Sequence, residues 1–447
     1  MTKAGVKKAH FVSLGCARNL VDSEIAAGLL GSGGWALTAF PKEADAVVIN
    51  TCAFTREARD ESNNEIEHLS KQISRSAKFV VCGCLGQKEK AKLFKKFPRI
   101  DAVVGSSDYR HIDDILKRIV SRHEKPPAHR APLDTIRREH LLCVGKPDFI
   151  ADSSFPRLLS TPASYAYIKI AEGCSNHCSY CAIPALRGEF RSRSIKDILT
   201  EAENVAAMGV KELILIANDT AFYGGDATGG KLGRLLEKLH VIKPVKRIRI
   251  LYMHPAHIGD SLIKKIASLP KVARYFDIPV QHTDDFILKR MNRPAFRKTQ
   301  RLIENIRKYM PDAAVRSTFI TGFPGETGKR FGNLAENLKK IKFSWVGVFN
   351  YSPEKGTPSF KMGGRASVAE ALRRAEKLME IQQEISFDFV RSFVGKKLEI
   401  IADSSFKGRT YFQAPDVDGE VLFKEKQLPG SLKKMKIISS KGYDLIA

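Results

Sequence analysis

The stretch that decides how this chain is interpreted is residues 166–181, AYIKIAEGCSNHCSYC. Its first five residues are mostly apolar and predict a buried strand. Cys174, Cys178 and Cys181 follow with the spacing C-x₃-C-x₂-C. Three thiolates on one short loop can ligate three irons of a four-iron cluster and leave the fourth iron open. The alternatives are a catalytic thiol, chance spacing or a zinc site, although structural zinc usually takes four ligands and no second cysteine pair lies nearby.

The same strand-then-loop pattern recurs through the middle of the chain. Apolar runs that end in polar, glycine or proline residues occupy 166–170, 213–217, 247–252, 275–278, 315–320 and 345–351. This repetition predicts a β/α barrel whose functional site lies at the carboxyl ends of its strands. Six units are too few for a closed eight-stranded barrel, so we expect an open one.

The first part of the chain places single cysteines in an equivalent position. Cys16, Cys52 and Cys84 each come just after a strand-like run, at 10–14, 46–49 and 79–81. Helical patterns separate these runs, which predicts a largely parallel α/β sheet. Because parallel strands end along one edge of a sheet, we expect the three thiols to converge there. Cys82 is an additional thiol beside Cys84 and is interpreted as a small apolar residue rather than a spare ligand.

The loop Cys174–Cys181, with Tyr180 before its last cysteine, resembles the radical S-adenosylmethionine (SAM) superfamily. The resemblance implies that the open iron binds SAM and that an electron from the cluster cleaves it to a 5′-deoxyadenosyl radical. The polar residues after two later barrel strands are then expected to contact SAM: Asn218, Asp219, Gly322, Gly325 and Glu326. Turn formation is the alternative explanation for each of these five.

The contexts of the first three cysteines resemble the methylthiotransferases of that superfamily. They read SLGCARNLVDSE (13–24), NTCAF (50–54) and GCLGQ (83–87). The resemblance implies a second four-iron cluster on Cys16, Cys52 and Cys84. The segments IAEGC (170–174), RGEFRSRS (187–194), LIANDT (215–220) and APDVDG (414–419) are similar to the RimO branch, which modifies the β-carbon of an aspartate in ribosomal protein S twelve. Asn218 departs from the family, where we expect Gln.

The predicted organisation is α/β overall with three domains. We expect an N-terminal cluster domain (1–120), a proline-containing linker (121–156), a radical SAM domain (157–391) and a small all-β barrel (392–447). The strands expected in the last are 397–402, 410–414, 420–423 and 435–438. This module resembles a TRAM domain, and we hypothesise that Asp416 and Asp418 favour a basic protein partner. Ser367, followed by Glu370, predicts the start of the preceding helix.

Composition limits the function classes. The chain has 74 Lys and Arg, 49 Asp and Glu, and eight cysteines in 447 residues. With no apolar run of membrane-spanning length and no signal peptide, we expect a cytoplasmic protein without membrane attachment. In that compartment the cysteines favour metal chemistry over disulfides. The net charge of +25 favours nucleic acid or a ribonucleoprotein as partner, and general solubility is the plainer explanation.

The leading interpretation is an enzyme that methylthiolates ribosomal protein S twelve, free or on the small ribosomal subunit. It implies two four-iron clusters, SAM and an electron-donating reductant, and we expect a monomer. One SAM would supply the radical and another the methyl group. The same reaction on a tRNA adenosine is the second interpretation. A non-catalytic iron–sulfur protein that binds RNA is the third, although such a protein has no need of an open iron.

Overall fold

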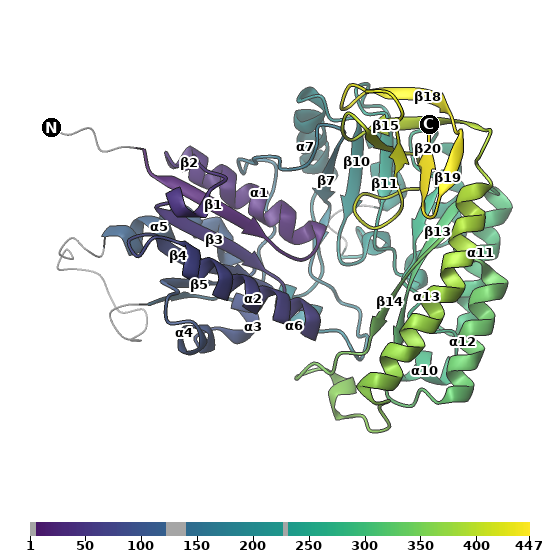
Figure 1. Ribbon diagram of the computed structural model, residues 1–447, viewed down its shortest axis with the longest axis horizontal. Coiled ribbons are helices and arrows are strands. Elements are labelled where there is room, and N and C mark those ends of the chain that lie inside the picture. Colours follow the sequence, from purple (N-terminus) through teal and green to yellow (C-terminus); the bar gives the residue numbers. More distant parts are fainter. Residues whose placement is uncertain (1–5, 122–139, 227–230) are drawn as a thin grey trace. The chain divides into compact units, whose positions relative to one another are not determined.

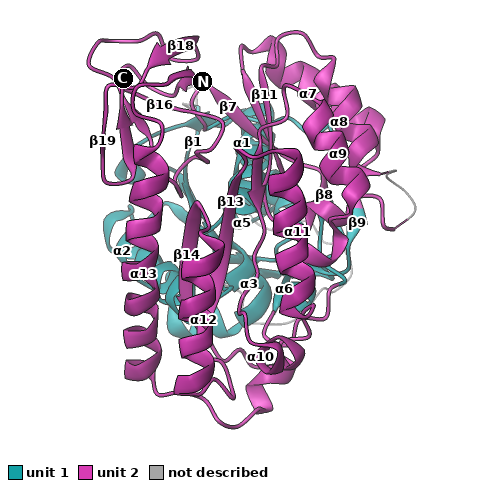
Figure 2. Ribbon diagram, turned by 90° about the vertical axis from the view of Figure 1, so that its right-hand side faces the viewer, with its two compact units in different colours: residues 1–160, 172–175, 182–191 teal, residues 161–171, 176–181, 192–447 magenta. Residues whose placement is uncertain are grey.

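The computed structural model describes residues 6–121, 140–226 and 231–447. Its contacts divide the chain into two compact units. The first consists of residues 1–160, 172–175 and 182–191, and the second of residues 161–171, 176–181 and 192–447 (Figure 2). Within the described residues, no helix combines the length and the hydrophobicity needed to cross a bilayer.

The first unit contains a six-stranded parallel sheet in the order β2-β1-β3-β4-β5-β6 (Figure 1). The strands are β1 (Lys8–Ser13), β2 (Ala36–Leu37), β3 (Ala46–Thr51), β4 (Lys78–Gly83), β5 (Ala102–Val104) and β6 (Leu141–Cys143). The helices that connect or follow them include α1 (Ala17–Ser32), α2 (Arg56–Gln72), α3 (Cys84–Glu89), α5 (Ile112–Ser121) and α6 (Ile183–Arg187). The predicted parallel α/β sheet is confirmed.

The core of this sheet follows from strand alternation. Val47 and Ile49 lie on one face of β3 and pack in a single cluster with Ile66 and Leu69 of α2. All four side chains are buried. Because side chains alternate along a strand, each central strand gives one such set to each face, and helices cover both.

The segment predicted to be a linker, 121–156, contains a strand of this sheet. Residues 122–139 lie outside the described part of the chain. Strand β6 then pairs in parallel with β5, with Leu141 opposite Ala102 and Cys143 opposite Val104. A three-residue edge strand among polar residues leaves almost no periodic signal, which is why the sequence did not reveal it.

The second unit contains an open barrel of six parallel strands. Its strands are β7 (Tyr165–Lys169), β10 (Glu212–Ile216), β11 (Arg247–Ile250), β12 (Tyr275–Asp277), β13 (Ala314–Thr321) and β14 (Trp345–Asn350). They form two three-stranded sheets, β11-β10-β7 and β12-β13-β14. The two are joined where Ile248 N donates to Lys271 O (2.7 Å) and Ala273 N donates to Ile248 O (2.8 Å). The expected open barrel is therefore present.

Helices surround these strands on the outside. They include α7 (Ile195–Ala207), α8 (Leu232–His240), α9 (Asp260–Ser268), α10 (Asp285–Arg290), α11 (Phe296–Tyr309), α12 (Gly328–Ile341) and α13 (Val368–Arg391). Figure 1 shows α12 and α13 running beside β13 and β14. Helix α13 begins as predicted, because Ser367 Oγ accepts a hydrogen bond from Glu370 N at 3.1 Å.

The C-terminal module is a six-stranded sheet in the order β18-β15-β16-β17-β20-β19. Its strands are β15 (Lys397–Ala402), β16 (Lys407–Arg409), β17 (Val421–Leu422), β18 (Leu432–Lys436), β19 (Ser439–Lys441) and β20 (Asp444–Ile446). The strand predicted at 410–414 is absent from the described structure. Carbonyls in that segment instead accept hydrogen bonds from barrel side chains: Arg249 donates to Tyr411 O (2.7 Å), and Trp345 donates to Phe412 O (2.6 Å).

This module contacts the amino ends of the barrel strands. Glu212, the first residue of β10, is fully buried and pairs with Arg249 (2.7 Å) and with Arg409 of the module (3.0 Å). Tyr275, the first residue of β12, donates to Asp418 at 2.7 Å. The module therefore lies at the end of the barrel opposite the cysteine loop, which follows the carboxyl ends of the strands.

The hypothesis that Asp418 recognises a basic partner is wrong. Its side chain is fully buried, and Oδ1 accepts from Arg316 at 2.6 Å. Oδ2 accepts from Tyr275 and from Ala414 N (2.8 Å). All these partners lie within the chain, so Asp418 joins the module to the barrel. Asp416 is exposed, and its contact with a basic partner stays a prediction.

We expect Glu212→Gln to loosen the joint between barrel and module. Burial raises the pKa of Glu212, but Arg249, Arg409 and Arg247 lower it more, to about 2 from the ordinary 4.5. The stabilisation is complete above pH 4.5 and is lost as the pH falls from 4.5 towards 2. The variant leaves buried guanidinium groups without their anion, which costs about 3–5 kcal/mol.

Urea unfolding at pH 7 measures this loss. Glu237→Gln is the matched control, because Glu237 pairs with Lys265 at the surface, where such pairs contribute about 0–1 kcal/mol. Equal unfolding free energies for the two variants would contradict the role given to Glu212.

Candidate active site

The three N-terminal cysteines lie at the carboxyl edge of the first sheet. Cys16 precedes α1 after β1, Cys52 directly follows β3, and Cys84 directly follows β4. These three strands are neighbours in the order β1-β3-β4. The loop of Cys16 comes close to Cys52, because a Cβ on Gly15 (φ +92°) would lie 2.8 Å from the Cys52 Cβ. The predicted convergence is confirmed.

The electrostatics of the three thiols are linked. Burial and the neighbouring Cys84 raise the pKa of Cys52 to about 11. Burial also raises the pKa of Cys84, against the opposing effect of Arg187. Burial alone would raise the pKa of Cys16 as well, but the cations of Arg18 and Arg187 lower it. Thiols of this kind become thiolates when a metal displaces their protons.

Cys16, Cys52 and Cys84 are all free thiols. Cys82 lies within β4 rather than after the end of a strand, and it is 2% exposed.

The loop of the other cysteine set follows β7 and the short strand β8 (Ala171–Glu172). Cys174 N donates to Gly188 O at 3.0 Å, and Cys181 N donates to Cys178 O at 3.1 Å. Burial raises the pKa of Tyr180, the Arg293 cation opposes this rise, and the neighbouring Cys178 and Cys181 add to it. Arg293 Nη1 is 3.8 Å from Cys178 Sγ, so a buried cation accompanies this thiol.

Asp219 holds the cysteine loop to the next strand end. Its Oδ2 accepts from Asn176 Nδ2 (2.8 Å) and from His257 Nδ1 (2.6 Å), and Oδ1 accepts from His254 N (3.2 Å). The Asp219 carboxylate is fully buried. Burial raises its pKa, but the hydrogen bond from His257 and the other nearby groups together lower it below the ordinary value. Asp219 was predicted to contact SAM, and its described partners make it a positioning residue for the loop.

His254 and His257 are site residues that the sequence analysis missed. Donor atoms of Asp219, His254 and His257 lie within 4.8 Å of one another, an arrangement that could hold a metal ion. Burial and the Arg293 cation lower the pKa of His254 to about 3, so this imidazole is neutral at pH 7. One feature of the sequence could have indicated these two histidines: the run HPAH (254–257) follows a strand-like segment.

The predicted loop 322–326 is closed by Glu326. Its Oε1 accepts from Gly322 N (3.0 Å) and from Arg374 of α13 (2.6 Å), and its Oε2 lies 3.2 Å from His282 Nε2. Gly322 adopts φ +75°, and a Cβ there would lie 2.6 Å from the Ala371 Cβ. The glycine is therefore needed for α13 to pack against the turn.

The remaining predicted position, Asn218, is half-buried and directly precedes Asp219. Tyr252 and Gln281, at two other strand ends, have positive φ angles of 62° and 75°. Such strain in residues other than glycine is often stored at functional sites. Gln281 Oε1 is buried and has no hydrogen-bond partner among the described residues. It is a further candidate contact that no sequence pattern indicated.

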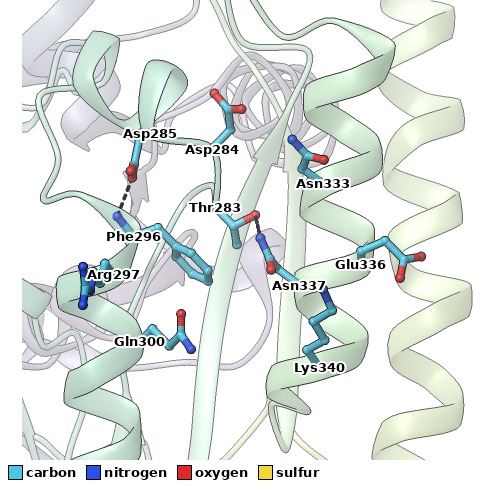
Figure 3. Close-up of a pocket in the computed structure, with 10 residues that line it drawn as sticks. All are labelled: Thr283, Asp284, Asp285, Phe296, Arg297, Gln300, Asn333, Glu336, Asn337 and Lys340. Atoms are coloured by element: carbon cyan, nitrogen blue, oxygen red, sulfur yellow. Dashed lines mark hydrogen bonds between the residues drawn. The ribbon is translucent and has the colours of Figure 1, made fainter.

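A separate pocket of about 470 Å³ lies between α11 and α12 (Figure 3). Its polar groups are engaged in local contacts: Asp285 accepts from Phe296 N at 2.7 Å, and Thr283 accepts from Asn337 Nδ2 at 3.1 Å. None of its lining residues is a predicted site residue, and we assign it no part in the site.

Comparison with known proteins gives a consistent result along the whole chain. Residues 8–105 match the family described as uncharacterized protein family UPF0004, residues 168–338 match the radical SAM superfamily, and residues 394–447 match the TRAM domain. A solved structure of similar fold is the radical SAM methyltransferase TsrM from Kitasatospora setae. It has a TM-score of 0.57 at 15% identity and covers 79% of this chain and 77% of its own.

Curated relatives are similar over nearly their full length. The chain is 38% identical to a protein of Heliobacterium modesticaldum (98% of this chain, 94% of the relative). It is 39% identical to one of Caldanaerobacter subterraneus (99% and 99%) and 41% identical to one of Syntrophus aciditrophicus (98% and 97%). All three carry the name ribosomal protein uS12 methylthiotransferase RimO. The chain is therefore a radical SAM enzyme that belongs to the RimO family of methylthiotransferases.

Proposed function

We propose that this enzyme transfers a methylthio group to the β-carbon of an aspartate in ribosomal protein uS12. The observation that carries the proposal is the placement of two cysteine triads, each after the carboxyl ends of parallel strands. One triad matches the radical SAM spacing, and the other lies in a domain that radical chemistry alone does not need. The names of the RimO relatives give ribosomal protein uS12 as the protein that is modified.

Two four-iron clusters are proposed, one on Cys174, Cys178 and Cys181 and the other on Cys16, Cys52 and Cys84. When bound, the first cluster and SAM supply the radical that removes hydrogen, and the second holds the sulfur that is methylated and transferred. The chain's own residues position these groups. Asn218 and the turn residues Gly322 and Gly325 are proposed to contact SAM.

Charged residues around the cysteine loop have distinct tasks in this proposal. Asp219 fixes Asn176 of the loop and orients His257, and Arg293 provides a cation for an anionic group beside Cys178. Glu326 keeps the turn 322–326 closed through Gly322 and therefore acts on SAM indirectly. In the C-terminal module, the exposed Asp416 remains a proposed contact for a basic partner such as uS12.

Mass spectrometry of reacted substrates tests the proposal. The protein is reconstituted anaerobically with iron and sulfide and incubated with SAM, reductant and either uS12 or a tRNA anticodon stem-loop. Replacement of H by SCH₃ adds about 46 Da, and we expect this gain on an aspartate of uS12 alone. A gain on adenosine would instead support the tRNA reaction, which the net charge of +25 favours. Formation of 5′-deoxyadenosine with neither substrate changed would contradict both assignments.

A further inference from the structure

Arg187 is a buried cation that reaches the first cysteine set from another part of the chain. It is the last residue of α6 and is 3% exposed. Its Nη1 donates to Asp22 at 2.6 Å and to Glu172 at 3.3 Å, and its Nη2 donates to Asn19 Oδ1. All these residues belong to the first unit.

The same guanidinium lies beside Cys84. Cys84 Sγ is 3.9 Å from Asn19 Oδ1, the atom that Arg187 Nη2 also contacts. Arg187 thus pairs with two carboxylates and shares the acceptor atom Asn19 Oδ1 with the Cys84 thiol.

The position of Arg187 is fixed by its backbone as well. The carbonyl of the next residue, Gly188, accepts the hydrogen bond from Cys174 N. Gly188 has φ +75°, and a Cβ there would lie 2.0 Å from Pro147 O, so the turn tolerates no larger residue. The guanidinium is therefore held against the sulfurs by a rigid turn rather than by its side chain alone.

The Arg187 cation would also affect a cluster bound by the neighbouring cysteines. A four-iron cluster becomes more negative when it is reduced, and its potential depends on nearby charge and on hydrogen bonds to its sulfurs. In a buried site the effect of one charge is only weakly screened. We infer that Arg187 is a positioning residue that raises the reduction potential of the cluster on Cys16, Cys52 and Cys84. The inference rests on the proposed second cluster.

Redox titration followed by electron paramagnetic resonance tests this inference. The parent is the full chain with Cys174, Cys178 and Cys181 replaced by Ala, so that the signal comes from one cluster. We expect Arg187→Gln to keep about four irons. Its midpoint should fall by ~59 mV or more, a tenfold change in the reduction equilibrium for one electron. Arg187→Lys retains the charge and should restore part of the shift.

A second pair of variants separates this effect from structural damage. Arg187→Gln with Glu172→Gln avoids leaving Glu172 as a buried anion without its cation. We expect a smaller fall in the same direction, because loss of the Glu172 anion raises the potential and offsets part of the effect. The control is Arg157→Gln with Glu24→Gln, which removes another buried ion pair from the same unit (2.6 Å). Its midpoint should equal that of the parent.

The outcomes distinguish the inference from the proposed function. An unchanged midpoint in either Arg187 variant that binds iron would overturn the role of Arg187, and so would an equal shift in the Arg157 control. A parent that binds no iron would instead contradict the second cluster itself, and the inference would fall with it.

Discussion

Replacing Cys178 by Ala should abolish reductive cleavage of SAM. The substitution removes one of three thiolates on the radical SAM loop, beside the cation of Arg293. With only two thiolates left, the four-iron cluster that carries the open iron is no longer held, and formation of 5′-deoxyadenosine should fall by roughly 10³-fold or more, equivalent to at least ~4 kcal/mol in the activation barrier. Chromatographic measurement of 5′-deoxyadenosine after anaerobic reduction gives this rate.

Cys143→Ala is the control for that experiment. Cys143 is a half-buried free thiol in β6, away from both proposed ligand sets in the sequence. Its replacement should leave the rate unchanged and the iron content at about eight per chain, against about four for Cys178→Ala. A Cys178→Ala protein that still forms 5′-deoxyadenosine at the normal rate would show that this loop does not carry the radical chemistry.

The second large effect is expected at Cys52. Cys52→Ala removes a ligand of the other proposed cluster, and the methylthiolated product should fall by roughly 10³-fold or more, on the same rate scale. Cleavage of SAM to 5′-deoxyadenosine should continue, because the radical SAM loop is intact. Parallel measurement of product mass and of 5′-deoxyadenosine in one reaction separates the two activities.

Cys82→Ala is the matched control, since Cys82 is buried beside the same edge and burial raises its pKa. Loss of one buried sulfur should lower the free energy of unfolding by about 1 kcal/mol. The amount of methylthiolated product should not change. If instead Cys82→Ala abolished product while Cys52→Ala did not, the ligand assignment at this edge would be reversed.

The barrel and both cysteine sets could be predicted because each signal is local. Apolar runs followed by Gly, Pro or polar residues identify parallel strands, and residues just after such strands share an edge. Strand β13 (Ala314–Thr321) differs from the predicted 315–320 by one residue at each end. Cys16, Cys52 and Cys84 converge for the same reason.

The features that could not be predicted depend on contacts between distant residues. Arg187 meets Asp22 across 165 positions, and Glu212 meets Arg409 across 197. The segment 410–414 has a strand-like composition, but its carbonyls accept hydrogen bonds from the side chains of Arg249 and Trp345 in the barrel. Asp418 was interpreted as a surface charge for the same reason, because nothing local indicates the partner that buries it.

Removal of hydrogen from the β-carbon of the substrate aspartate can be followed with an isotope label. uS12 with aspartate deuterated at the β-carbon is incubated with the reconstituted enzyme, SAM and reductant, and the 5′-deoxyadenosine is analysed by mass spectrometry. If the enzyme removes hydrogen from that carbon, 5′-deoxyadenosine gains one deuterium, about 1 Da, in step with the gain on uS12. Unlabelled 5′-deoxyadenosine together with a modified substrate would contradict the account.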